Sequence, residues 1–335
     1  MTSTPTRIAM AAMAVCSLAA PACRDEVSLG NPRPLEIPPS LLPACPEGDE
    51  LETLAEVAIE YGPIRAMKAD SGDLFVVAAR DKLPGTLLHL TNGSLQFVAT
   101  VGVGPAAIAL DRNTVLVACS ESSQVFRVAR NGTTTLFVAN QPGVRAVVAA
   151  ESGDMAYWVL TGDTGAVRQY YFGSSSFYTR ENVEPPVSIA NDGKSIYISG
   201  AQGPVIKGIG SFSDPSIRLP GRCDGRMLVL TEQDLLCVDG NAINRIPRDE
   251  LRAATTRAVL PNGTISDLVA GAGRAFFRFE PQAGPPYASY IMNMPLVGNS
   301  APTVISRLPG AAKFLTADDC HLYFADKSTL RRWRL

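Results

Sequence analysis

A short stretch of strand-forming residues recurs about every forty positions along most of this 335-residue chain. Each copy follows a turn and carries an aromatic or large apolar residue at a fixed place. The aligned residues are Phe75, Leu116, Tyr157, Tyr197, Leu236, Phe276 and Tyr323, at separations of 41, 41, 40, 39, 40 and 47 residues. A regular repeat of this length indicates one supersecondary unit that is used many times.

The second repeat shows what one unit contains. Four strand patterns follow one another over residues Ala107–Leu110, Val115–Ser120, Gln124–Ala129 and Thr134–Val138. The last two are joined by Asn131-Gly132, and Asn-Gly is the strongest short hairpin signal because both residues tolerate positive φ. Seven four-stranded units of this length predict an all-β fold, a seven-bladed β-propeller.

The two ends of the chain are expected to share the seventh blade. The last repeat holds only three strand patterns, over Phe314–Ala317, His321–Ala325 and Thr329–Leu335. The segment Glu56–Pro63 is similar to the outer strand that ends before Gly104-Pro105, so we expect this N-terminal strand to complete the last blade. Closure of the ring in this way removes exposed sheet edges. A competing interpretation makes Leu51–Val57 the start of an amphipathic helix.

The first residues are expected to direct export. An apolar, alanine-rich run from Ile8 to Ala22 is too short to cross a bilayer as a helix, so residues 1–22 are predicted to be a signal peptide. The small residues Ala20-Pro21-Ala22 stand directly before Cys23, which resembles the cleavage box of bacterial lipoproteins. That resemblance implies that Cys23 is the lipidated N-terminus, and ordinary secretion is the alternative.

Residues 23–50 are predicted to be a tether between the lipid and a domain that spans residues 51–335. Six prolines fall within this stretch, at positions 32, 34, 38, 39, 43 and 46. Proline fixes φ and removes backbone donors, so the stretch is a semi-rigid spacer of about 3 Å per residue, or roughly 70 Å in all. We therefore expect a periplasmic or cell-surface protein that meets the membrane only through its lipid anchor.

The cysteines agree with export to an oxidising compartment. Five follow Cys23 and none forms a CxxC pair, which disfavours zinc binding. We expect a Cys45–Cys320 disulfide to lock the closure of the ring, and a second bridge between Cys223 and Cys237 near the opposite face. Cys119 remains as a small buried apolar residue. The alternative is five reduced, buried thiols.

The sequence carries none of the common catalytic motifs. The sequence lacks HExxH, GxSxG, P-loop and CxxCH patterns, and we expect no catalytic residue, metal or cofactor. The two histidines, His89 and His321, have no evident partners and are expected to be structural. The formal charge of -2 is nearly balanced, which argues against nucleic-acid binding.

One position in the repeat is rich in cations. Counting back nine to twelve residues from the aligned position reaches the start of each innermost strand, where propellers usually bind ligands. The residues there are Arg65, Ala107, Arg145, Ser188, Arg226, Ser266 and Lys313. Four basic side chains around one opening favour a carboxylate, a phosphate or an acidic partner. The alternative is that strand starts simply meet solvent.

The turns on the opposite face are acidic. They contain Asp70, Asp73, Asp111, Glu151, Asp154, Asp192, Glu232, Asp318 and Asp319. Aspartate is also a good turn former, so these residues can be structural.

The repeat resembles bacterial extracytoplasmic propellers of the NHL and YVTN type, through the segments Val115–Cys119, Val125–Val128 and Leu322–Asp326. The spacing of the repeat is also similar to that of gluconolactonase-type propellers, which hold a divalent metal with Glu, Asn and Asp at the opening. Here the corresponding position is mostly basic, with only Asp224 and Asp267 close by, which disfavours a metal.

These patterns together predict a monomeric binding or scaffold module for an envelope protein or an anionic small molecule. A metal-dependent lactonase-like hydrolase is one alternative. A structural envelope protein without a small ligand is the other. Fold by itself does not choose among them.

Overall fold

The structure is a computed structural model in which the chain divides into two units, Met1–Ala44 and Cys45–Leu335. It describes residues 51–335 except 71, 92, 112, 151–154, 162–164, 182–185, 192–194, 201–203, 210–216, 224–226, 230–233, 249–252, 283–288, 297–299, 309–312, 319 and 327. The predicted signal peptide, Cys23 and the tether therefore lie outside the described residues. Within the described part, no helix is long and apolar enough to span a membrane.

The described strands form seven antiparallel sheets of four strands each. Three sheets come from the first half of the chain: β2 (Ile64–Asp70), β3 (Asp73–Ala78), β4 (Pro84–Thr91) and β5 (Ser94–Val103); β6 (Pro105–Asp111), β7 (Thr114–Cys119), β8 (Gln124–Ala129) and β9 (Thr134–Val138); and β10 (Val144–Ala149), β11 (Met155–Leu160), β12 (Ala166–Tyr171) and β13 (Ser176–Glu181). Three more follow: β14 (Pro186–Asn191), β15 (Ser195–Gly200), β16 (Pro204–Ile209) and β17 (Ile217–Arg222); β18 (Met227–Val229), β19 (Asp234–Asp239), β20 (Ala242–Pro247) and β21 (Thr255–Val259); and β22 (Gly263–Gly271), β23 (Arg274–Pro281), β24 (Ser289–Pro295) and β25 (Thr303–Leu308). The last sheet joins β1 (Leu51–Glu56) to β26 (Lys313–Ala317), β27 (His321–Asp326) and β28 (Thr329–Arg334).

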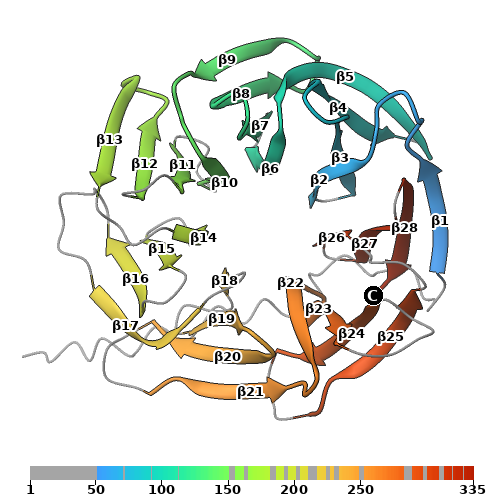
Figure 1. The fold of residues 1–335 in the computed structure, drawn as a ribbon, viewed down its shortest axis with the longest axis vertical. Helices are drawn as coiled ribbons and strands as arrows, with labels where there is room; N and C mark the ends of the chain where they lie inside the picture. The colour runs from blue at the N-terminus through green and yellow to red at the C-terminus, as the bar shows by residue number, and fades with distance from the viewer. Residues whose placement is uncertain are drawn as a thin grey trace, which may run out of the picture. The chain divides into compact units, whose positions relative to one another are not determined.

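The sheets stand around a common axis, with the first strand of each repeat innermost (Figure 1). Each aligned residue of the sequence repeat lies on the second strand of a sheet and is at most 5% exposed. These side chains pack between neighbouring sheets: Phe75, for example, contacts a cluster that includes Val115 and Val117 of the next sheet. Burial on both faces explains why the second strands are almost continuously apolar. The fold is a β-propeller.

The strand that joins the two ends of the chain is not the predicted one. β1 spans Leu51–Glu56 and pairs with β28 from Leu51↔Trp333 to Glu56↔Thr329. The predicted segment Glu56–Pro63 is mostly a turn, in which Tyr61 N–H donates to the Ala58 carbonyl at 3.0 Å. The amphipathic-helix interpretation of Leu51–Val57 is wrong as well.

A turn inserted after β1 explains the misplacement. β5, the strand used for comparison, runs almost to Gly104-Pro105, whereas β1 ends well before Gly62-Pro63. The chain between them turns, with Gly62 at φ +83° and Ile59 89% exposed. The matching Gly-Pro pairs mark the entry to the next innermost strand, not the end of the outer one.

Hydrogen bonds between described residues join the last sheet to the first. The Ala69 N–H of β2 donates to Thr316 Oγ1 of β26 at 2.9 Å in a buried position. The Gly72 N–H donates to Asp318 Oδ2 at 3.2 Å. Glu52 of β1 pairs with Arg332 of β28 at 2.5 Å, so the N-terminal strand also has an ionic contact.

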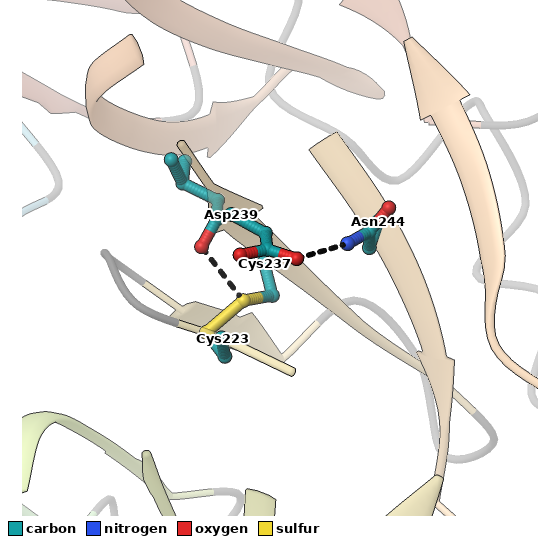
Figure 2. The surroundings of a disulfide bond; sticks show 5 residues. Cys223, Cys237, Asp239 and Asn244 are labelled. Atoms are coloured by element: carbon teal, nitrogen blue, oxygen red, sulfur yellow. Dashed lines mark hydrogen bonds between the residues drawn. A yellow bond between two sulfur atoms is a disulfide. The ribbon is translucent and has the colours of Figure 1, made fainter. Parts of the chain in front are cut away.

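A disulfide joins Cys223, which directly follows β17, to Cys237 on β19 of the next sheet (Figure 2). The Cα atoms are 5.6 Å apart, and both cysteines belong to a buried cluster with Tyr197 and Leu235. Cys320 is also disulfide-bonded, while Cys45, its predicted partner, lies outside the described residues. Cys119 is free and buried, and burial raises the pKa of its thiol to about 12.

Candidate functional site

Most innermost strands contain a β-bulge close to their start. One residue is skipped in the pairing with the second strand of the same sheet. The skipped residues are Arg65, Ala106, Arg145, Val187, Ser266 and Phe314. A bulge bends the strand and changes the direction of a side chain, and bulges are over-represented beside binding and active sites. We call these six positions, together with the residues on either side of them, the mouth.

The mouth agrees only in part with the cation position predicted from the sequence. Arg65, Arg145 and Ser266 are bulged residues. Ala107 and Ser188 each follow a bulge, and Lys313 precedes one. Arg226 lies outside the described residues. The predicted set therefore mixes three strand positions. In the sheets of Ala107 and Ser188 the bulge lies ten residues before the aligned residue, whereas the prediction counted back nine; in the last sheet it lies nine before, whereas the prediction counted ten.

Arg145 is an exposed cation among the described residues of the mouth. It lies on β10 between buried Val144 and half-buried Ala146. Among the residues that the structure describes, it has no ion-pair or hydrogen-bond partner. A free guanidinium presents five N–H donors in a planar fork, which suits a carboxylate or a phosphate.

Arg65, in contrast, is already engaged. Its Nε donates to the Ala79 carbonyl at 3.2 Å, and its Nη2 pairs with Asp81. The Asp81 side chain is 88% exposed. Surface pairs of this kind contribute about 0–1 kcal/mol, so Asp81 is a replaceable partner for Arg65.

The sixth sheet supplies a hydroxyl and an acid at the mouth. Ser266 Oγ is buried and has no hydrogen-bond partner among the described residues. Asp267, next to it, is held by Arg278 at 3.2 Å, and Arg278 also contacts Glu280 at 2.6 Å. Asp224, the other acid that sequence comparison places near a metal position, lies outside the described residues. Within the described part, no group of three or more His, Cys, Asp or Glu side chains could hold a metal.

A second polar position was missed in the sequence. The third-strand residue opposite each aligned residue is polar: His89, Arg127, Gln169, Lys207, Arg245, Asn293 and Arg332. Several of these side chains contact the second-strand residue that lies two positions before the aligned residue. Arg127 Nε, for example, donates to Thr114 Oγ1 at 3.1 Å. The spacing from the aligned residue ranges from nine to seventeen, so counting along the chain at a fixed offset could not find it.

Of the predicted acidic turn residues, Asp73, Asp111 and Asp318 make hydrogen bonds that indicate structural roles. Asp73 accepts hydrogen bonds from His89 and from Arg130 of the neighbouring sheet. Asp111 contacts Thr114 and Arg127. Asp318 accepts from two backbone amides and from the Tyr323 hydroxyl at 2.9 Å. Asp70 is exposed at the end of β2, and the other five predicted acids lie outside the described residues.

Both histidines have carboxylate partners, which were not evident from the sequence. His89 Nε2 lies 2.9 Å from Asp73 Oδ1, and its ring stacks on Phe75 at 4.3 Å between centroids. His321 Nδ1 lies 3.4 Å from Asp318. Burial lowers the pKa of His321 against the opposing effect of that carboxylate, while burial, reinforced by Asp318, raises the pKa of Tyr323.

The Asp73 contacts predict an acid-dependent contribution to stability. Burial acts to raise the pKa of Asp73, but the hydrogen bonds and charges of Arg130 and His89 outweigh it and hold that pKa below 3.8. A depressed carboxyl pKa stabilises the fold above the ordinary value, and that stability is lost as pH falls through the folded-state pKa. Replacing Asp73 by asparagine should therefore cost stability at pH 6, with a smaller difference from wild type in strong acid. Urea unfolding at several pH values measures this, and a pH-independent difference would contradict it.

Comparisons with known proteins give the fold and nothing finer. No protein-family profile matches the sequence, and no curated protein matches it. A streptogramin B lyase structure has a TM-score of 0.66 at 13% identity, covering 85% of this chain and 97% of that one. A catalytically inactive virginiamycin B lyase from Staphylococcus aureus, with quinupristin, has a TM-score of 0.64 at 14% identity, covering 85% and 99%. A gluconolactonase from Xanthomonas campestris has 0.51 at 12%, covering 85% and 89%.

At such identities the likeness is one of architecture. It supports the β-propeller fold and carries no activity over to this chain. The finer resemblance to NHL and YVTN propellers, and the lipoprotein type, stay predictions.

Proposed function

We propose that this chain is an exported, lipid-anchored β-propeller that binds an anionic small molecule or an acidic envelope protein at its mouth. The observation that carries the proposal is Arg145, an exposed cation without a partner among the described residues. An unpaired guanidinium on a rigid strand needs no rearrangement to accept a carboxylate or phosphate, and charge-assisted hydrogen bonds are about twice as strong as neutral ones.

Two other mouth residues, on β2 of the first sheet and β22 of the sixth, add to the site. Arg65 can exchange its exposed partner Asp81 for a ligand oxygen at little cost. Ser266 has a buried hydroxyl without a partner in the described part, which can donate to an anion. Arg226 and Lys313, if they face the same opening as the sequence predicts, add two further charges.

Export rests on the sequence of residues 1–50 and on the disulfide. Disulfides persist in oxidising compartments, and Cys223–Cys237 joins two neighbouring sheets in the buried interior. The hydrolase alternative gains no such support, because Asp267 is neutralised by Arg278 at 3.2 Å.

Reversal of the charge at Arg145 should abolish most of the binding. We expect Arg145→Glu to weaken the affinity for inorganic phosphate or succinate by about tenfold or more, since a charge-assisted hydrogen bond is worth roughly 1.5–3 kcal/mol. The matched control is Arg218→Glu, an exposed arginine on outer strand β17, which makes the same charge change away from the mouth. Isothermal titration calorimetry measures both.

The variant Asp81→Asn tests the same site in the opposite direction. It releases Arg65 and should tighten anion binding, a gain that a purely structural mouth would not show. Equal effects of Arg145→Glu and Arg218→Glu, or no effect of either, would overturn the proposal.

A further inference from the structure

His89 makes a hydrogen bond with each of its two ring nitrogens. Nε2 lies 2.9 Å from Asp73 Oδ1, and Nδ1 lies 3.1 Å from Thr91 Oγ1. Asp73 begins β3, whereas His89 and Thr91 lie two residues apart at the end of β4. Because β2 starts at the mouth and ends at Asp70, these residues lie at the end of the first sheet away from the mouth. We call Thr91, His89 and Asp73 the first-sheet triad.

The charge of Asp73 decides which nitrogen of His89 carries the proton. Burial acts to raise the pKa of Asp73, but Arg130 and His89 hold that pKa below 3.8. Asp73 is therefore a carboxylate at neutral pH and only accepts hydrogen bonds, so the proton of a neutral His89 ring lies on Nε2. Nδ1 is then an acceptor, and the Thr91 hydroxyl must donate to it. A nucleophile, a general base and an orienting carboxylate have this same order of hydrogen bonds.

The imidazole of the first-sheet triad is fixed in orientation and open to solvent. Its ring stacks on the buried Phe75, with 4.3 Å between centroids and an interplanar angle of 6°. The His89 side chain is 23% exposed, and Thr91 is half-buried. A Cβ atom added to Gly72 or Gly93, in the turns beside the triad, would meet no atom within 4 Å. Space for a substrate therefore lies next to Thr91.

The other sheets show that the fold does not require this group. The third-strand polar position is a histidine in the first sheet and not in the six others. The position two residues later, occupied by Thr91 in the first sheet, carries no aliphatic hydroxyl elsewhere: the residues there are Ala129, Tyr171, Ile209, Pro247, Pro295 and Arg334. A similar contact joins Asp234 to Arg245 in the fifth sheet, but arginine stays protonated and cannot act as a base.

We propose that the first-sheet triad hydrolyses carboxylic esters, with Thr91 as nucleophile and His89 as general base. Thr91 Oγ1 forms a bond to the ester carbonyl carbon while its proton passes to His89 Nδ1. The bond from that carbon to the leaving oxygen then breaks, and the imidazolium gives its proton to this oxygen, which departs as an alcohol. A water molecule repeats both transfers on the acyl-threonine, which releases the acid and restores Thr91. Such an activity departs from the expectation, based on motifs, that the chain has no catalytic residue.

Arg130 supplies positive charge for the oxyanion that forms in each step. Its Nη1 pairs with Asp73, and its guanidinium carbon lies 5.6 Å from the centroid of Phe75, the ring on which His89 stacks. Among the described residues it makes no other hydrogen bond, so its remaining N–H groups are available to a developing negative charge.

Release of p-nitrophenol from p-nitrophenyl acetate by the full chain measures this activity. We expect turnover above the rate of hydrolysis in buffer, and an acetyl group on Thr91 in mass spectra after rapid quenching. Thr91→Ala should lower the turnover at least about a hundredfold, since it removes the nucleophile on which the base acts, whereas Thr91→Ser should retain most of it. Asp73 touches no substrate and is a positioning residue. Asp73→Asn should therefore lower kcat with little change in KM, because the amide favours the opposite tautomer of His89.

The matched controls lie outside the first-sheet triad. His321→Gln removes the other histidine of the chain, and Thr114→Ala removes a threonine hydroxyl that an arginine contacts instead of a histidine. Both should leave the turnover unchanged, and circular dichroism should show that every variant is folded. Turnover by Thr91→Ala equal to that of wild type would overturn the assignment. Equal losses in His89→Gln and His321→Gln, or a wild-type rate no higher than that of buffer, would overturn it too.

Discussion

Replacing Trp158 by alanine is expected to lower the free energy of unfolding by about 3–5 kcal/mol, the range for truncation of a large buried aromatic residue. Trp158 lies on β11, is fully buried, and packs between the second and third sheets against Leu116, Val125 and Val138. Its indole N–H donates to Gln141 Oε1 at 2.8 Å in a buried position. The substitution therefore leaves a cavity and also removes the donor from a buried amide oxygen.

A second substitution separates these two effects. Trp158→Phe keeps most of the apolar contact, including the edge-on contact with Phe137 at 6.0 Å, but it removes the donor to Gln141. We expect it to cost about 1–3 kcal/mol, as for a buried polar group left unsatisfied. The control Val304→Ala, at a side chain 44% exposed, should stay within about 0.5 kcal/mol of wild type. Urea unfolding measures all three, and a Trp158→Ala variant as stable as the control would refute the packing described for this interface.

Removal of the Cys223–Cys237 bridge, by alanine at both positions, is expected to cost about 3 kcal/mol. The bridge closes a loop with a sequence separation of 14, and a cross-link over a loop of about this length stabilises by roughly that amount through its effect on the unfolded chain. The loop contains β18, which has only three residues and is the shortest described strand. Without the bridge, this innermost strand should be the first to exchange its amide hydrogens.

Hydrogen exchange and urea unfolding both test that expectation. The control is Cys119→Ala, which removes a buried free thiol and no cross-link, and should cost only the small cavity it leaves. Equal losses in the single and the double variant would show that the thiols contribute by packing alone. Unchanged exchange in β18 would show that the bridge does not hold this strand.

Local patterns in the sequence located the second strands and several of the hairpins. Phe75 and its six counterparts lie on the second strands, where burial on both faces demands an apolar run. The hairpin at Asn131-Gly132 joins β8 to β9 as predicted, with Gly132 at φ +87°. These features depend on residues close together in the chain, so a single sequence contains them.

The contacts of the mouth residues could not be predicted from the sequence. The sequence pattern predicts that Arg65 is a free cation. In the structure, however, Arg65 pairs with Asp81, sixteen residues away. The bulges shift which residue of each innermost strand faces the mouth, and only the pairing register reveals where they fall. Arg145 has the same sequence pattern as Arg65 but no described partner, and the sequence could not separate the two.

The sequence by itself determined the repeat, the turns between neighbouring strands and the cysteine pair at Cys223 and Cys237, because each follows from residues within one or two strands of each other. The tertiary structure alone decided that Leu51–Glu56 rather than Glu56–Pro63 pairs with β28, that both histidines face carboxylates, and that Arg145 has no partner among the described residues while Arg65 has one. Those outcomes arise where residues distant in the chain meet, and the energies that choose among such contacts depend on neighbours that no local pattern specifies.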